Sequence, residues 1–218
     1  MRLFKKKEKK TWIEKEPCIV KCPNCGKEHT LAVFEHKTRL DGMPALPMTE
    51  FMKAFSVCEC GMLVTKVEFN PNVMQLDGYQ QAMKEPDPTV RLLKLLYYAN
   101  AEDATCWLRI ADYYREQEMY GPERESLLKY IEALKCGNCH PWETVYAGQF
   151  ASLKIENHIC IHAEHCLIDA YRRIADWNAA LNCIQQERKR EYYADSGDIM
   201  RWLRKEEKLI KSRDTAPQ

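Results

Sequence analysis

Cysteine is the residue type in this chain that points most clearly to chemistry, because eleven cysteines occur among its 218 residues. Two short segments pair them closely: Cys22-Pro23-Asn24-Cys25-Gly26 and Cys58-Glu59-Cys60-Gly61. A CxxC turn presents two thiolates from one tight bend, and zinc prefers four soft ligands in a tetrahedron. The glycine after each second cysteine lets the backbone reverse direction. The spacing therefore predicts a Zn²⁺ site with the ligands Cys22, Cys25, Cys58 and Cys60.

The second segment departs from the commonest spacing, because it is CxC and not CxxC. Cys18 is the alternative ligand, in place of Cys58 or Cys60. A site with four cysteine ligands leaves no open coordination position, so the metal is expected to be structural and not catalytic. The competing interpretation is that these residues are ordinary buried thiols.

The elements that must position these cysteines are short strands. The segment Glu28–His36 follows the first pair and is rich in apolar residues, whereas Leu63–Phe69 follows the second pair and alternates between apolar and polar positions. A period of two residues is typical of a half-buried strand. We therefore expect a charged tail over residues 1–10 and a zinc-ribbon domain over 11–72, with a turn-rich loop over 41–47 and a short helix within Met48–Phe55.

Helical periodicity replaces this pattern from residue 73 onward. We expect a helical domain over 73–212 and a frayed C-terminus over 213–218. The first helix carries Val73, Leu76, Tyr79 and Met83, and Pro88 is well placed to open the second, since a proline is tolerated at the first helical position. A third expected helix carries Trp107 to Tyr114. A fourth begins after Gly121-Pro122, with Gly137 as its terminating residue. Four more are expected near 142–155, 158–175, 178–189 and 198–211.

Two segments of the helical part have the order of residues found in tetratricopeptide-type helix pairs. One runs from Trp107 through Ile110 and Ala111 to Tyr114, and the other from Leu167 to Ile184. A plain stack of helical hairpins would use the same packing rules. With the CPNCG and CECG motifs, the chain resembles bacterial protein families that join an N-terminal CPxC-type zinc ribbon to a tetratricopeptide-like helical region. The resemblance implies an α+β multidomain fold in which a small β zinc ribbon is followed by an all-α antiparallel domain. It implies no particular activity.

A second group of residues with metal-binding potential lies farther along the chain. Cys136-Gly137-Asn138-Cys139-His140 matches the CxxCH pattern of c-type haem attachment, but the chain shows no export signal, so we expect no haem. The helix expected near 158–175 would place His158, His162 and His165 on one face. Either these histidines and Cys136, Cys139 and His140 form a second metal site, or they belong to a polar helix face.

The bulk composition excludes few functions. The net charge is +1, no apolar run approaches the length of a membrane helix, and no nucleotide-binding glycine loop or hydrolase motif occurs. We therefore expect a cytoplasmic, non-enzymatic adaptor or regulatory protein with a protein partner. The first alternative is a nucleic-acid-binding protein that uses the basic tail Lys5, Lys6, Lys7, Lys9 and Lys10. The second is a redox or metal-dependent enzyme built on Cys136, Cys139 and the cluster His158–His165.

Overall fold

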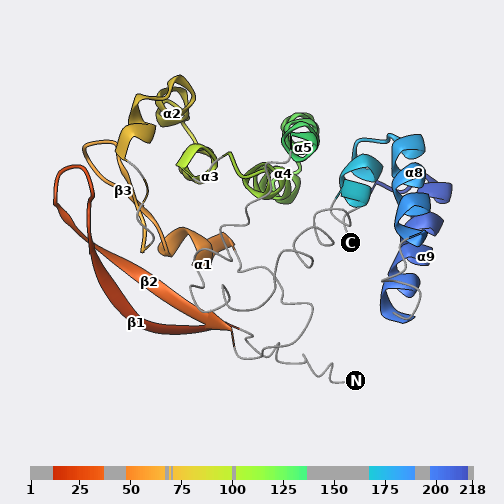
Figure 1. Cartoon of the computed structure of the whole chain (residues 1–218), viewed down its shortest axis with the longest axis horizontal. Coiled ribbons are helices and arrows are strands. Elements are labelled where there is room, and N and C mark those ends of the chain that lie inside the picture. Colours follow the sequence, from red (N-terminus) through yellow and green to blue (C-terminus); the bar gives the residue numbers. More distant parts are fainter. Residues whose placement is uncertain are drawn as a thin grey trace, which may run out of the picture. The chain divides into compact units, whose positions relative to one another are not determined.

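The computed structural model describes residues 12–36, 48–66, 69, 71–99, 102–136, 167–189 and 197–215 (Figure 1). The chain forms two compact units, 1–99 and 100–218. Within the described residues, the first unit contains two small antiparallel sheets and three α-helices, and the second unit is helical. The first unit thus includes two helices beyond the predicted ribbon segment 11–72. Within the described residues, no helix is both long and apolar enough to cross a membrane.

A two-stranded ribbon dominates the start of the first unit. Strand β1 (Trp12–Lys21) pairs antiparallel with β2 (Glu28–His36), as the red and orange arrows of Figure 1 show. The register shifts between Lys15 and Cys18, where Pro17 has no N–H to donate to the ladder. The predicted strand Glu28–His36 is confirmed, whereas β1 was not foreseen.

The second sheet is much shorter than the sequence pattern indicated. It consists of β3 (Ser56–Val57) and β4 (Leu63–Val64) in antiparallel register. The expectation of one alternating strand over Leu63–Phe69 is wrong, because strand geometry ends at Val64 and the three successive residues Leu63, Val64 and Thr65 are all buried. Both faces of the chain are covered at these three residues, so the alternation of residue types does not correspond to an inner and an outer face there.

The helices of the first unit follow the second sheet in sequence, apart from α1 (Met48–Lys53), which confirms the short helix expected within Met48–Phe55. The predicted helix through Val73 and Met83 is divided into a 3₁₀ turn (Pro71–Gln75) and α2 (Asp77–Met83), with Leu76 exposed between them. Pro88 opens α3 (Pro88–Ala99) as expected. The Asp87 carboxylate caps this helix by accepting the backbone N–H groups of Thr89 and Val90 at 2.8 and 3.0 Å.

Within the described residues, the second unit contains four helices and one shorter helical segment. They are α4 (Thr105–Glu116), α5 (Tyr120–Lys135), the helical residues 167–173, α8 (Trp177–Arg188) and α9 (Gly197–Ser212). The prediction of helices at these places is confirmed, although α5 begins at Tyr120, before the predicted Gly121-Pro122 start, and the part of the helix expected near 158–175 that precedes residue 167 lies outside the described residues. The helix expected near 142–155 and the terminating role of Gly137 fall outside the described residues.

Three helices of this unit end in the same manner, with a residue other than glycine in the left-handed conformation. These residues are Glu118 (φ 58°), Ala175 (φ 64°) and Arg213 (φ 56°). In each case the next N–H reaches back across the last turn, from Met119 to Tyr114 (2.8 Å), from Asp176 to Tyr171 (2.9 Å) and from Asp214 to Leu209 (2.9 Å). This is the hydrogen-bond pattern of a Schellman motif, in which glycine usually occupies the left-handed position.

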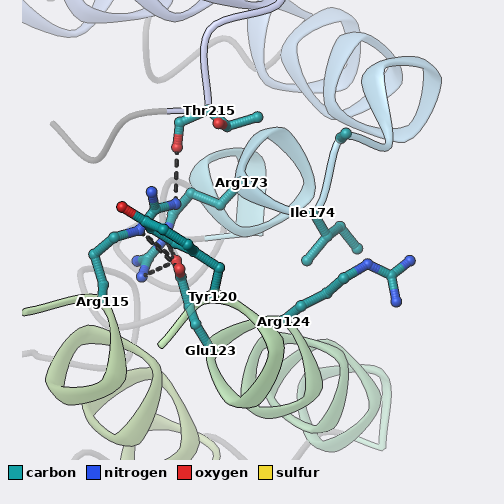
Figure 2. Close-up of a pocket in the computed structure, with 8 residues that line it drawn as sticks. Arg115, Tyr120, Glu123, Arg124, Arg173, Ile174 and Thr215 are labelled. Atoms are coloured by element: carbon teal, nitrogen blue, oxygen red, sulfur yellow. Dashed lines mark hydrogen bonds and ion pairs between the residues drawn. The ribbon is translucent and has the colours of Figure 1, made fainter. Parts of the chain in front are cut away.

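Buried ion pairs connect the helices of the second unit. The Glu123 carboxylate, only 3% exposed, accepts Arg115 Nε at 2.8 Å and Arg173 Nη2 at 2.8 Å. Arg172 is fully buried and donates through Nε to Glu206 at 3.0 Å. A cavity of about 500 Å³ lies beside the first of these networks, and Figure 2 shows Arg115, Glu123 and Arg173 meeting at its wall.

Candidate metal centre

Four cysteine sulfurs from two chain reversals meet in the first unit. Cys22 and Cys25 lie in the connection from β1 to β2, and Cys58 and Cys60 lie in the connection from β3 to β4. All four Sγ atoms lie within 4.8 Å of one another. The shortest separations cross between the two reversals, with Cys22 Sγ 3.6 Å from Cys60 Sγ and Cys25 Sγ 3.5 Å from Cys58 Sγ. The four residues singled out by their spacing are therefore brought together.

This arrangement has the dimensions of a tetrahedral thiolate site. Metal–sulfur bonds of about 2.3 Å in a tetrahedron place neighbouring sulfurs about 3.8 Å apart. The observed separations of 3.5 and 3.6 Å lie close to that value, and the upper limit of 4.8 Å leaves the remaining pairs near it. The cluster can hold a metal ion with four protein ligands, and such an ion would have no open position for a substrate.

Each reversal is built by the glycine that follows its second cysteine. Gly26 has φ +76° and donates its N–H to the Cys22 carbonyl at 2.9 Å, whereas Gly61 has φ +87° and donates to the Cys58 carbonyl at 2.8 Å. These φ values lie in the left-handed region that favours glycine. Both motifs therefore reverse the chain at a glycine with positive φ, although the hydrogen bond spans four residues in CPNCG and three in CECG.

The groups around the sulfurs shift the pKa values of Cys60 and Cys25 in opposite directions. For Cys60, burial raises the pKa, but hydrogen bonds from the Asn24 side chain and the Met62 N–H outweigh it and lower the pKa to about 6. For Cys25, a hydrogen bond from the Lys27 N–H lowers the pKa, but thiol neighbours and burial raise it to about 12. Crowded thiols cannot all ionise without a cation, because each new thiolate meets the charge of its neighbours.

Tyr79 of α2 hydrogen-bonds to the backbone of the second reversal, next to Cys60. Its hydroxyl accepts the Leu63 N–H at 2.8 Å and donates to the Gly61 carbonyl at 3.0 Å. The side chain is fully buried, and burial raises the pKa of the phenol to about 12, so the hydroxyl remains a donor. Sequence reasoning placed Tyr79 only on an apolar helix face, and its polar role depends on contacts 16 and 18 residues away.

Two side-chain pairs join the first and second reversals at the surface of the cluster. Lys27 Nζ lies 2.6 Å from Glu59 Oε1, and His29 Nδ1 lies 3.0 Å from Ser56 Oγ. Lys27 follows the first cysteine pair, and Glu59 is the single residue between Cys58 and Cys60. These contacts fix the relative position of the two turns and do not add a ligand.

Cys18 packs against this cluster as a half-buried apolar neighbour. Within the described residues it is not part of the group of four sulfurs. The alternative that Cys18 replaces Cys58 or Cys60 as a ligand has no support in this geometry.

The second predicted metal site lies almost wholly outside the described residues. Of its members only Cys136, exposed at the end of α5, is described, whereas Cys139, His140, His158, His162 and His165 are not. The basic tail Lys5–Lys10 lies outside them as well.

Comparison with known proteins adds no relative. No protein-family model, curated protein or solved structure matches the chain.

Proposed function

We propose that this chain is a zinc-binding adaptor in which a structural Zn²⁺ ion, held by Cys22, Cys25, Cys58 and Cys60, stabilises the first unit and the helical second unit binds a protein partner. The observation that supports it most strongly is the convergence of four sulfurs within 4.8 Å. The proposal assigns the chain no catalytic reaction.

Zinc is the metal that best suits this ligand set. Thiolates are soft ligands that select zinc or iron–sulfur chemistry, and closed Cys₄ sites of two paired knuckles are typical of structural zinc. The cysteines lie in one part of the core of the first unit, where Leu31, Met62 and Val64 accompany the buried Cys22 and Cys58. Because an unfolded chain rarely holds a preformed metal site, metal binding there would add to the folding free energy of the unit.

The second unit has features that favour tetratricopeptide-like helix pairs. α4 packs against α5, and the fully buried Ala111 lies on the α4 face where the predicted pattern requires a small residue. The pair formed by residues 167–173 and α8 repeats the turn geometry of the α4–α5 pair, with Ala175 taking the left-handed position that Glu118 takes there. Repeats of this kind commonly present surfaces for protein binding.

A protein partner is favoured by the surface of α5. Tyr120 and Leu128 are 59% and 41% exposed, and Arg124 lies between them at four-residue spacing. Tyr120 and Arg124 also line the cavity of Figure 2. Tyrosine and arginine are enriched among the residues that carry binding energy at protein interfaces. We therefore assign the partner to this face, referred to below as the α5 face (Tyr120, Arg124 and Leu128).

Elemental analysis of the purified chain tests the zinc part of the proposal. One zinc per chain is expected in the wild type and none in Cys22→Ser, whereas Cys106→Ser, which changes a buried cysteine of the second unit, should retain it. Two zincs per wild-type chain would show a further site in the segment that contains His158, His162 and His165. No bound metal at all would overturn the proposal.

The partner part is tested by cross-linking in the cell that produces the protein. A photoreactive residue at Leu128 should give one dominant protein adduct, and the same group at Lys129, an exposed position about 100° around α5 from Leu128, should give less of it. The adduct should be lost on Tyr120→Ala. An adduct that forms equally from both positions and survives Tyr120→Ala would contradict the assignment to the α5 face.

A further inference from the structure

Helix α9 separates its charges more sharply than the other helices of the second unit. The exposed charged side chains from residue 201 to 211 are all basic: Arg201, Arg204, Lys205, Lys208 and Lys211. Apart from the adjacent pair Arg204 and Lys205, they follow one another at steps of three residues, and all five lie within an arc of about 120° on the helix surface. At a rise of about 1.5 Å per residue, this basic row extends for about 15 Å.

Glu206 and Glu207, the acidic residues of α9 whose side chains the structure describes, are directed to other contacts. Glu206 is fully buried against Arg172 at 3.0 Å, and Glu207 pairs with Arg188 of α8 at 2.6 Å and with Lys211 at 2.9 Å. Lys211 nevertheless has 67% of its side chain exposed. Neither carboxylate therefore interrupts the basic row.

Three members of the row are available to an external anion. Arg204, Lys205 and Lys208 form no ion pair within the part of the chain that the structure describes. Like charges at these spacings destabilise a helix, so helix stability does not explain the arrangement. The exposed charges of α5 provide the contrast, because Arg124, Lys129 and Lys135 alternate there with two exposed glutamates.

The surroundings of the row favour one class of partner. A membrane surface requires an amphipathic helix with a free apolar face, but the apolar side of α9 is packed inside the unit, with Leu203 0% and Ile210 2% exposed. Protein interfaces are depleted in lysine and are anchored by apolar or aromatic side chains. Within the described residues, α9 has no large exposed apolar side chain.

We propose that the basic row of α9 binds the phosphate backbone of a nucleic acid. One strand carries a phosphate about every 3.4 Å along the helix axis, so a row of about 15 Å lies opposite about four phosphates. Arg204, Lys205 and Lys208, together with the largely exposed Lys211, match that number. The contact is to phosphates and therefore carries no sequence preference of its own. It is independent of the zinc site and of the α5 face.

Binding of the full-length, zinc-loaded chain to a labelled duplex DNA and to a labelled single-stranded RNA, measured over about 50 to 200 mM salt, tests the proposal. With about four phosphates neutralised, the logarithm of the affinity for duplex DNA should fall with the logarithm of salt concentration with a slope of about −3.6. The triple variant Arg204→Gln, Lys205→Gln, Lys208→Gln should reduce that slope by about 2.7.

The matched control is Lys53→Gln, Lys66→Gln, Lys84→Gln, which removes the same charge from exposed positions of the first unit. It should leave the slope near the wild-type value. Equal effects of the two triple variants, or binding to neither nucleic acid, would overturn the proposal. It would also be overturned if deletion of residues 1–10 abolished binding while the α9 variant bound as the wild type. Zinc content is measured in every variant, so failure here is distinguishable from failure of the zinc proposal.

Discussion

Replacing Tyr79 by phenylalanine removes only the hydroxyl that holds the second cysteine reversal. That hydroxyl accepts the Leu63 N–H at 2.8 Å and donates to the Gly61 carbonyl at 3.0 Å, and its side chain is fully buried. A net hydrogen bond is worth about 0.5 to 1.5 kcal/mol, and a buried group left without a partner costs more than that. We expect Tyr79→Phe to destabilise the zinc-bound first unit by about 2 to 3 kcal/mol.

The same loss should appear in the metal affinity, because the reversal that presents Cys58 and Cys60 becomes less preorganised. Removing a group that supports metal ligands typically weakens binding by about 10- to 100-fold. The assay is competition for zinc with a chromophoric chelator, which gives both the affinity and the release rate. Tyr120→Phe is the matched control, since its ring is 59% exposed and lies in the other unit. An unchanged zinc affinity and unchanged stability of Tyr79→Phe would refute this reasoning.

Three predictions concern the second unit and are checked by thermal melting. Glu123→Gln removes the charge that Arg115 and Arg173 share, although Arg173 keeps Asp112 at 2.7 Å. It should cost about 1.5 to 3 kcal/mol, the range for hydrogen bonds to charged groups, whereas the exposed neighbour Glu125→Gln should change stability little. Similar melting points for the two variants would count against the buried network. Burial raises the pKa of Glu206 in the folded protein, although its partner Arg172 lowers it, so the stability that Glu206 contributes is fully present below its ordinary pKa and is lost as the pH rises through the raised value. The wild type should therefore lose stability relative to Glu206→Gln as the pH increases. A stability difference between the two proteins that does not change with pH would contradict this prediction. Glu118→Gly removes the strain of a non-glycine residue in the left-handed conformation at the end of α4 and should stabilise the unit by up to about 1 kcal/mol. A lower melting point would show that the glutamate side chain contributes more stability than this strain costs.

The cluster of four cysteines could be predicted from the sequence because the residues that build each half are local. Each cysteine pair and its glycine form one turn, and the positive φ values of Gly26 and Gly61 are those that favour glycine. The requirement of four ligands then predicts that the two turns meet. The CxC spacing of Cys58 and Cys60 shortens the hydrogen-bonded turn by one residue but still brings both sulfurs into the cluster.

The parts that could not be predicted depend on contacts between distant residues. β1 contains Glu14, Lys15, Glu16 and Pro17, which have low strand propensity, and its strand geometry comes from pairing with β2. The pattern at Leu63–Phe69 indicated a longer strand than β4, since residue types alone do not report that both faces are covered. Buried charges are equally invisible to periodicity: an arginine such as Arg172 is expected at the surface unless its partners are known.

X-ray absorption at the zinc edge, on the purified full-length chain, measures the ligands of the proposed zinc ion themselves. We expect one zinc per chain, surrounded by four sulfur atoms at about 2.3 Å and no nitrogen or oxygen ligand. Loss of one sulfur from that shell in Cys58→Ser would identify the second reversal as part of the site. A shell with a nitrogen ligand in the wild type, or a chain that binds no zinc, would show that the four cysteines do not form a Cys₄ zinc site.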